Sequence, residues 1–244
     1  MKLNCDMGES FGSWSKGMDA EVMPYIDMAN IACGFHASDP MTMDLTVRMA
    51  LDNKVEIGAH PGYPDLLGFG RRDLTCSAQE LKMIVTYQIA ALDGICRVNG
   101  TRISYVKPHG ALYNKMMQDA DVLTAVMAGV ADYNRELALV VLAKSDRDAV
   151  ERLADAKGLQ LLFEAFADRA YDDNGNLVKR NQPGAVLQDQ QQIEQQVLEI
   201  VRQGKVTSLG GLSVPLKADT ICVHGDNEQA VSAARHIRES IGVL

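Results

Sequence analysis

The sequence predicts an α/β protein, and more specifically a TIM-like barrel of seven β/α units. Short aliphatic runs alternate with amphipathic helical stretches along the whole chain, as is typical of parallel sheets. Ionisable residues come directly after most of these runs, and parallel strands open onto one face. The 244 residues show no linker-like stretch. We therefore expect a single barrel domain over 1–244, and the alternative is an open doubly wound sheet.

The first three predicted strands each end in a polar loop. They cover Met1–Asp6, Tyr25–Cys33 and Val55–Ala59. The third breaks at His60-Pro61-Gly62-Tyr63-Pro64, because two prolines and a glycine cannot continue a central strand. His60 is therefore expected where a strand ends and a loop begins.

The helices after these strands carry start signals of their own. Asp39 followed by Pro40 is typical of an N-cap and first helical position, and this helix should end near Asn53. Ser77 and Glu80 form a capping-box pattern at the start of the next helix.

The second half continues the alternation. Strands are expected at 103–106, 137–142, 159–163 and 220–223. One helix should follow His109 and carry Leu123 and Val126, another should be capped by Ser145, and others should cover about 189–203 and the stretch from 227 onward. The polar stretch 171–186 is expected to form a loop or small hairpin that would serve as a lid.

Composition excludes several classes of function. A net charge of −8 argues against a nucleic-acid partner or an anionic membrane surface. No apolar run approaches the ~20 residues of a membrane span, and the N-terminus lacks a signal peptide. The five scattered cysteines form no C-x-x-C pair. They predict reduced thiols in a cytoplasmic protein, with Cys5, Cys33 and Cys222 acting as small buried hydrophobes.

Four of the five histidines, His36, His60, His109 and His224, fall just after a predicted strand. In a parallel barrel all strand carboxyl ends open onto one face, so these side chains should converge there. Other ionisable residues at strand ends should join them: Asp6, Glu9, Asp39, Lys107, Asp168, Arg169 and Asp226.

Such a cluster suits hydrolysis of an acyl-type bond. Histidine carries protons near neutral pH, a carboxylate such as Asp6 could activate water, and Lys107 could stabilise an oxyanion or phosphate. Arg71 and Arg72 would either clamp a carboxylate or phosphate, or form surface ion pairs.

A metal site is a second hypothesis for the same residues. Asp6, His36 and His60 would suit a divalent metal with open positions, although no pair has a tight H-x-x-x-H spacing. No G-x-x-x-x-G-K-[ST] motif occurs, so spacing indicates no nucleotide site.

Six motifs in order resemble the LamB/YcsF family from end to end. They are Asn4–Glu9 (NCDMGE), Asn30–His36 (NIACGFH), Gly58–Pro61 with Gly68–Arg72 (GAHP and GFGRR), Lys107–Asn114 (KPHGALYN), Phe166–Arg169 (FADR) and Val223–Asp226 (VHGD). One departure is Ser38, where the His-Ala-Gly-Asp pattern has glycine. A serine there should matter little unless the backbone needs a positive φ.

The resemblance implies a seven-stranded barrel related to glycoside hydrolase and deacetylase barrels. It also implies the A subunit of an ATP-dependent 5-oxoprolinase, which converts 5-oxo-L-proline, ATP and water to L-glutamate, ADP and phosphate. Partner subunits B and C would activate the lactam by phosphorylation, and this chain would help to open the ring. ATP with Mg²⁺ is expected at an unassigned site, and no bound organic cofactor is expected.

The resemblance suggests roles for the strand-end residues. Asp6 or His60 would be the base, His36 and His109 proton shuttles, and Lys107 the cation for developing negative charge. Substrate contacts are expected from Glu9, Asp39, Arg71, Arg72, Asp168, Arg169, His224 and Asp226. Two alternatives are a metal-dependent carbohydrate deacetylase and a non-catalytic binding subunit of the complex.

Overall fold

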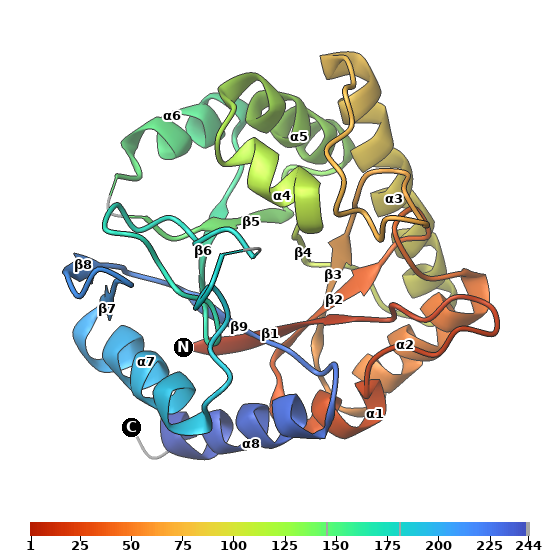
Figure 1. Cartoon of the computed structure of the whole chain (residues 1–244). Helices are drawn as coiled ribbons and strands as arrows, with labels where there is room; N and C mark the ends of the chain where they lie inside the picture. The colour runs from red at the N-terminus through yellow and green to blue at the C-terminus, as the bar shows by residue number, and fades with distance from the viewer. Residues whose placement is uncertain (145, 181, 243–244) are drawn as a thin grey trace.

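A computed structural model describes residues 1–144, 146–180 and 182–242 and shows a closed barrel of parallel strands (Figure 1). In order around the barrel they are β1 (Lys2–Met7), β2 (Met28–Ala32), β3 (Glu56–His60), β4 (Tyr105–Val106), β5 (Ala138–Leu142), β6 (Leu161–Phe166) and β9 (Thr220–Val223). Strand β9 pairs with both β1 and β6, which closes the ring. The predicted seven-stranded barrel is confirmed, and the open sheet is wrong.

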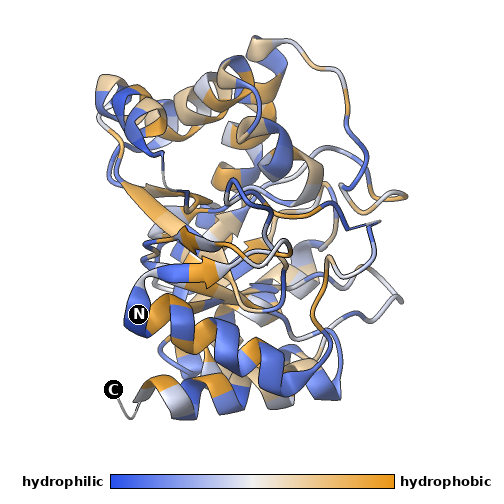
Figure 2. Ribbon diagram, turned by 60° about the vertical axis from the view of Figure 1, so that its left-hand side comes forward, coloured by the Kyte–Doolittle hydropathy of each residue, from blue (hydrophilic) through white to orange (hydrophobic). Residues whose placement is uncertain are grey.

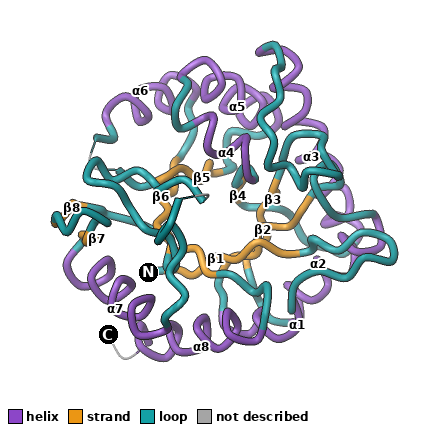
Figure 3. The backbone as a smooth tube through the Cα atoms, viewed as in Figure 1, coloured by secondary structure: helices purple, strands orange, loops and turns teal. Residues whose placement is uncertain are grey.

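Helices surround the strands, with α4 placed inward of the outer ring (Figure 3). They are α1 (Asp19–Val22), α2 (Pro40–Asp52), α3 (Ala78–Val98), α4 (Gly110–Met116), α5 (Ala120–Tyr133), α6 (Asp148–Lys157), α7 (Gln190–Gln203) and α8 (Glu228–Gly242). Hydrophobic and hydrophilic residues alternate along the helix that ends at the C-terminus, as expected for a helix with one face on the barrel (Figure 2). Within the described residues, no helix has both the length and the apolar character needed to cross a bilayer.

Local signals explain where the predictions differ from the structure. The second strand begins at Met28 rather than Tyr25, because Pro24 opens a 3₁₀ turn, η1 (Met23–Tyr25). The helix expected after His109 is two helices, α4 and α5, because the side chain of Asp119 caps a new start. The predicted cap Ser145 lies outside the described residues, and α6 begins at Asp148.

Two further segments lie outside the barrel. A small antiparallel sheet, β7 (Lys205–Thr207) with β8 (Ser213–Pro215), was not predicted. The described residues of 171–186 form a loop, as expected, with isolated bridges from Tyr171 to Leu177 and from Arg169 to Val186.

The interior of the barrel is partly polar. Alternate residues of a strand point to opposite faces. In β1, Leu3, Cys5 and Met7 belong to the apolar core, whereas Asn4 and Asp6 make hydrogen bonds inside the barrel. Asn30 Nδ2 donates to Asn4 Oδ1 over 2.8 Å, and the Tyr105 hydroxyl donates to Asn30 Oδ1 over 2.8 Å. These bonds satisfy polar groups that burial would otherwise leave unpaired.

Ser38 occupies the left-handed region, with φ of 75°, and is fully buried. The backbone at this position therefore does need the positive φ that glycine adopts without steric cost. Residues with a Cβ pay about 1–2 kcal/mol in this conformation. The departure from the family pattern at Ser38 is thus a strained position next to the start of α2.

We predict that Ser38→Gly stabilises the protein by about 0.5–1 kcal/mol, because relief of the left-handed strain exceeds the greater unfolded-state entropy of glycine. Urea denaturation of both proteins measures the difference. Ser38→Ala retains the strain and is the matched control. Equal midpoints for Ser38→Gly and Ser38→Ala would contradict the explanation.

Candidate active site

A buried ammonium group lies at the centre of the site. Lys107 follows β4, and its Nζ lies 3.0 Å from Asp6 Oδ1 and 2.7 Å from Glu164 Oε1. Nζ also donates to Asn4 Oδ1 and to the sulfur of Cys222. Burial alone would lower the pKa of Lys107, but the two carboxylates raise it well above its ordinary value. Lys107 is therefore a permanent cation inside the barrel.

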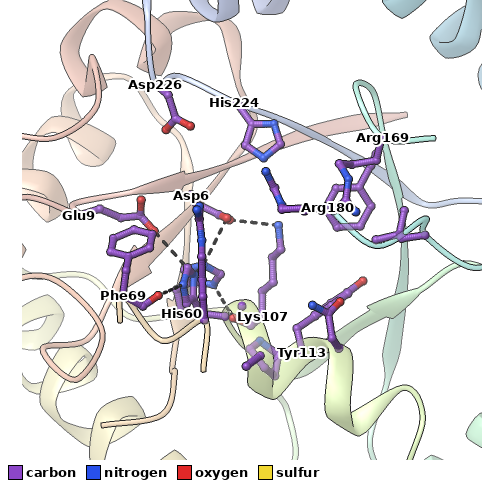
Figure 4. Close-up of a pocket in the computed structure, with 18 of the residues that line it drawn as sticks. Asp6, Glu9, His60, Phe69, Lys107, Tyr113, Arg169, Arg180, His224 and Asp226 are labelled. Atoms are coloured by element: carbon purple, nitrogen blue, oxygen red, sulfur yellow. Dashed lines mark hydrogen bonds and ion pairs between the residues drawn. The ribbon is translucent and has the colours of Figure 1, made fainter. Parts of the chain in front are cut away.

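Asp6 lies between this cation and a histidine (Figure 4). Its Oδ1 accepts from Lys107 and from Asn30 Nδ2, and its Oδ2 lies 3.3 Å from His60 Nε2. Burial alone would raise the pKa of Asp6, but His60 and Lys107 lower it well below its ordinary value. The carboxylate is therefore ionised, and its side chain remains 23% exposed at the floor of a cavity.

Three imidazoles pack together beside Asp6. His60 Nδ1 lies 2.6 Å from the Lys107 carbonyl oxygen, and His109 Nδ1 lies 3.0 Å from His60 Nε2. His36 stacks on His109 with ring centroids 3.7 Å apart. Burial, together with the neighbouring imidazoles, lowers the pKa of both His36 and His109 well below the ordinary value. These two rings are therefore neutral at neutral pH.

The loop after β3 gives these rings their space through two glycines. A Cβ on Gly62 would lie 2.8 Å from His36 Nδ1, and a Cβ on Gly70 would lie 2.7 Å from His36 Cβ and 2.9 Å from His109 Cδ2. Gly70 also has a φ of +61°. The glycine-rich loop is therefore required for the histidine packing, independently of any ligand.

The cavity above this floor has a volume of about 430 Å³. The part of the lining formed by Asp6, His60, Lys107 and His109 is called the floor. Several cationic side chains also line the cavity: Lys16, Arg71, Arg169, Lys179 and Arg180. A cavity with this lining can bind a small anionic ligand, such as a carboxylate or a phosphate ester, although the whole chain is acidic.

Arg169 holds one wall of the cavity in place. Its guanidinium donates to the carbonyl oxygens of Val178 over 2.6 Å and Ala185 over 3.3 Å. Residues 177–180 of that loop line the cavity. Arg169 lies at the cavity as predicted, but these bonds engage it with the backbone of the loop, beside Arg180 (Figure 4).

His224 and Asp168 form an ion pair on the β9 side of the cavity, with Nδ1 and Oδ2 2.8 Å apart. Burial opposes the charge on His224, but Asp168 outweighs burial and raises the pKa of His224. Burial alone would raise the pKa of Asp168, but His224 lowers it. Asp226 also lines the cavity and lies 4.0 Å from Lys16 Nζ.

Four residues expected at the site are not among the described residues that line the cavity. Two of them contact residues that do line it, since His36 stacks on His109 and Asp168 pairs with His224. The other two are Asp39 and Arg72. Asp39 accepts hydrogen bonds from the backbone of Gly12, Met41 and Thr42, so its carboxylate caps α2. Arg72 pairs with Asp65 in a separate surface recess. The helix cap and the ion pair thus hold the charges of Asp39 and Arg72 away from the cavity.

Other site residues were missed by the sequence analysis. Glu164 is fully buried and pairs with Lys107. Its position in β6, two residues from Leu162 and from Phe166, could have indicated an inward-facing carboxylate. Lys16 and Arg180 come from irregular loops, where periodicity gives no signal.

The fold and the site together define a (β/α)₇-barrel protein with an acid–base cluster at the carboxyl ends of its strands. The LamB/YcsF family model matches residues 1–243. The chain is 55% identical over 239 residues to the A subunit of 5-oxoprolinase from Pseudomonas fluorescens (strain Pf0-1), covering 98% of this chain and 96% of that protein. It is 54% identical over 241 residues to the A subunit of 5-oxoprolinase from Vibrio cholerae serotype O1 (strain O395), covering 99% and 97%. The chain therefore belongs to the LamB/YcsF family.

Solved structures agree with this assignment. The lactam utilization protein from Thermus thermophilus superposes with a TM-score of 0.92 at 39% identity, covering 99% of this chain and 97% of that one. A protein from Enterococcus faecalis V583, named for cellobiose-phosphate cleavage, has a TM-score of 0.59 at 13% identity, covering 99% and 93%. The second likeness shows a shared fold alone.

We predict that Lys107→Met destabilises the protein by about 3–5 kcal/mol, because Asp6 and Glu164 would remain buried without their cation. Urea denaturation measures the loss. Adding Glu164→Gln to that variant should recover part of it. The exposed pair Lys2–Glu56 is the matched control, and Lys2→Met should cost only about 0–1 kcal/mol. A double variant less stable than Lys107→Met alone would contradict this account.

The His224–Asp168 pair predicts a pH-dependent stability. Since the folded-state pKa of His224 is raised, its contribution is complete below about pH 6.5 and is lost as pH rises through the raised value. Since the pKa of Asp168 is lowered, its contribution is present above about pH 3.9 and is lost as pH falls through the lowered value. The pair should therefore stabilise most between these limits.

Replacing Asp168 by Asn should lower the pKa of His224 and reduce stability more at about pH 6 than at about pH 8.5. Histidine titration by NMR and urea denaturation at the two pH values measure these effects. An unchanged His224 titration in Asp168→Asn would show that the ion pair does not set this pKa.

Proposed function

We propose that this chain is the A subunit of an ATP-dependent 5-oxoprolinase. The complex would hydrolyse the lactam of 5-oxo-L-proline to L-glutamate, with ATP and Mg²⁺ consumed to give ADP and phosphate. Relatives that match nearly the whole chain are named as the A subunit of 5-oxoprolinase, and that name supports work within a multi-subunit complex. Subunits B and C would be the partners, and we expect the complex to act in the cytoplasm.

The observation on which the proposal rests is the pairing of Lys107 with Asp6 at the floor of a cation-lined cavity. Hydrolysis of a ring amide places negative charge on the carbonyl oxygen as water adds. A fixed ammonium in a water-poor site stabilises such charge without reorganisation. Lys107 offers that charge, and the raised pKa keeps it protonated.

Asp6 is the group that we assign to the attacking water. One oxygen is held by Lys107 and Asn30, and the other lies beside His60. That second oxygen could accept a hydrogen bond from water while the first fixes the orientation of the carboxylate. Water activation and charge stabilisation would then come from two side chains in direct contact, with Lys107 Nζ 3.0 Å from Asp6 Oδ1, which suits a single tetrahedral intermediate.

Arg71 is our assignment for the anionic part of the ligand. The substrate bears a carboxylate, and phosphoryl activation of the lactam by B and C would add a second anionic group. Arg71 lines the cavity and lies over the Phe69 ring, with its guanidinium carbon 5.1 Å from the ring centroid. A stacked guanidinium is a common partner of carboxylates and phosphates.

Glutamate formation from 5-oxo-L-proline, with ATP, Mg²⁺ and subunits B and C, tests the proposal. Asp6→Asn should lower kcat by about 10²-fold or more, because the variant keeps the shape but loses the proton acceptor. Arg71→Ala should raise KM by about 10-fold or more, because it removes a charged contact with the ligand.

Arg72→Ala is the matched control, since Arg72 is the sequence neighbour of Arg71 but pairs with Asp65 outside the cavity. It should keep kcat and KM near the wild-type values. Near-normal turnover of Asp6→Asn in an intact complex would place the chemistry on B and C and leave this chain as a binding subunit. Carbohydrate deacetylation by the isolated chain, without glutamate formation, would replace the proposal with a deacetylase.

A further inference from the structure

Four side chains beside Asp6 direct atoms that could bind a metal at one small volume. Glu9, His36, His60 and His109 each offer one ligand atom, and these atoms all lie within 4.8 Å of one another. The three histidines are buried, and Glu9 has a side chain that is 9% exposed. The question is what stabilises three imidazoles and one carboxylate when their polar atoms lie so close together.

The hydrogen bonds of two histidines determine which nitrogen carries the proton. His60 Nδ1 lies 2.6 Å from the carbonyl oxygen of Lys107, and His109 Nε2 lies 2.9 Å from that of Phe69. A carbonyl oxygen can only accept, so both of these nitrogens must donate. Where no further proton is bound, the lone pairs of His60 Nε2 and His109 Nδ1 then face each other across 3.0 Å. Two lone pairs at that distance repel unless a cation lies between them.

His36 and Glu9 add further buried polar atoms without hydrogen-bond partners. Neither ring nitrogen of His36 has a hydrogen-bond partner among the described residues, and Glu9 Oε1 has none there either. Glu9 Oε1 lies 3.5 Å from His36 Nε2 and 3.7 Å from His109 Nδ1, while its other oxygen faces Lys16. Buried polar atoms without partners are costly and rare.

A single proton between His60 and His109 would relieve only that pair. It would leave His36 and Glu9 Oε1 without partners, since both are directed at the same volume from other sides. One metal ion would satisfy all four donors together. Histidine ligands also commonly donate their second nitrogen to a backbone carbonyl, which His60 and His109 do.

We propose that Glu9, His36, His60 and His109 form a binding site for one divalent transition-metal ion of the zinc class. Zinc bonds of about 2.0–2.1 Å in a tetrahedron place ligand atoms about 3.3 Å apart. The pairs measured here are 3.0, 3.5 and 3.7 Å apart. Imidazole favours zinc, iron, nickel or copper, whereas Mg²⁺ prefers oxygen ligands and retained water. The structure therefore selects a transition metal over Mg²⁺.

The position of this site relates it to the proposed reaction. Glu9, His60 and His109 line the cavity, and Asp6 Oδ2 lies 3.3 Å from His60 Nε2. Because four protein ligands complete a tetrahedron, the bound ion would fix Glu9, His60 and His109 beside Asp6 at the cavity. This relation rests on the proposed function, whereas metal binding itself does not.

Metal binding by the purified chain tests the inference directly. The protein is stripped with a chelator, dialysed and titrated with Zn²⁺ by calorimetry and with Co²⁺ by visible absorption. We expect one equivalent of either ion and Co²⁺ bands typical of nitrogen and oxygen ligands. Mg²⁺ should give no binding of this strength. Absence of stoichiometric Zn²⁺ and Co²⁺ binding would overturn the proposal.

Variants assign the ion to the cluster. Glu9→Gln keeps the shape of the side chain and should weaken Zn²⁺ binding by about 10-fold or more, as should His36→Gln. His224→Gln is the matched control, because this histidine lines the same cavity but pairs with Asp168; it should bind Zn²⁺ as the wild type does. Circular dichroism confirms the fold of each variant. Unchanged affinity in Glu9→Gln, or equal loss in His224→Gln, would overturn the assignment.

The same measurements separate this inference from the proposed function. A chain that binds one Zn²⁺ through the cluster but forms no glutamate with B and C would retain the metal site and refute the 5-oxoprolinase assignment. A complex that forms glutamate while this chain binds no transition metal would support the 5-oxoprolinase assignment and refute the metal site.

Discussion

The buried ammonium of Lys107 is the interaction on which the rest of the site depends. Removing a cation from water is costly, and only close carboxylates and further acceptors offset that cost. Asp6 from β1 and Glu164 from β6 supply the charges, and Asn4 supplies an acceptor. One cation, which follows β4, therefore connects β1 and β6 inside the barrel. The ammonium group also holds one oxygen of Asp6 and so fixes the orientation of that carboxylate.

Buried acid–base groups and cationic side chains line the same cavity. Burial and the neighbouring imidazoles lower the pKa of His109 and of His36, which stacks on it, so both rings are neutral. The cations Lys16, Arg71 and Arg180 come from loops and line the same cavity. Screening is weaker in the buried layer, so small displacements there have large electrostatic effects. Gly62 and Gly70 matter for this reason, since any side chain at either position would move the imidazoles.

Much of the floor could be predicted because parallel strands share one direction. His60, Lys107 and Asp6 lie at or just beyond the carboxyl ends of three strands, and a barrel brings such ends together whatever their separation in sequence. The same argument failed for Asp39, because its carboxylate caps a helix and is directed away from the cavity. For Arg72 the sequence left two alternatives, and the structure shows the ion pair, with Asp65. Position along the chain does not determine where a side chain points once local hydrogen bonds compete for it.

By itself, the sequence determined the class of fold, the number of barrel strands and the group of strand-end residues from which the site is drawn. These depend on periodicity and on chain breaks at proline and glycine, which are local properties. Only the tertiary structure decided that Glu164 faces Lys107, that the ligand atoms of Glu9 and three histidines lie within 4.8 Å of one another, and that Lys16 and Arg180 reach the cavity. Those contacts depend on barrel register and loop paths, because they join residues far apart in the chain whose spacing in sequence carries no periodic signal.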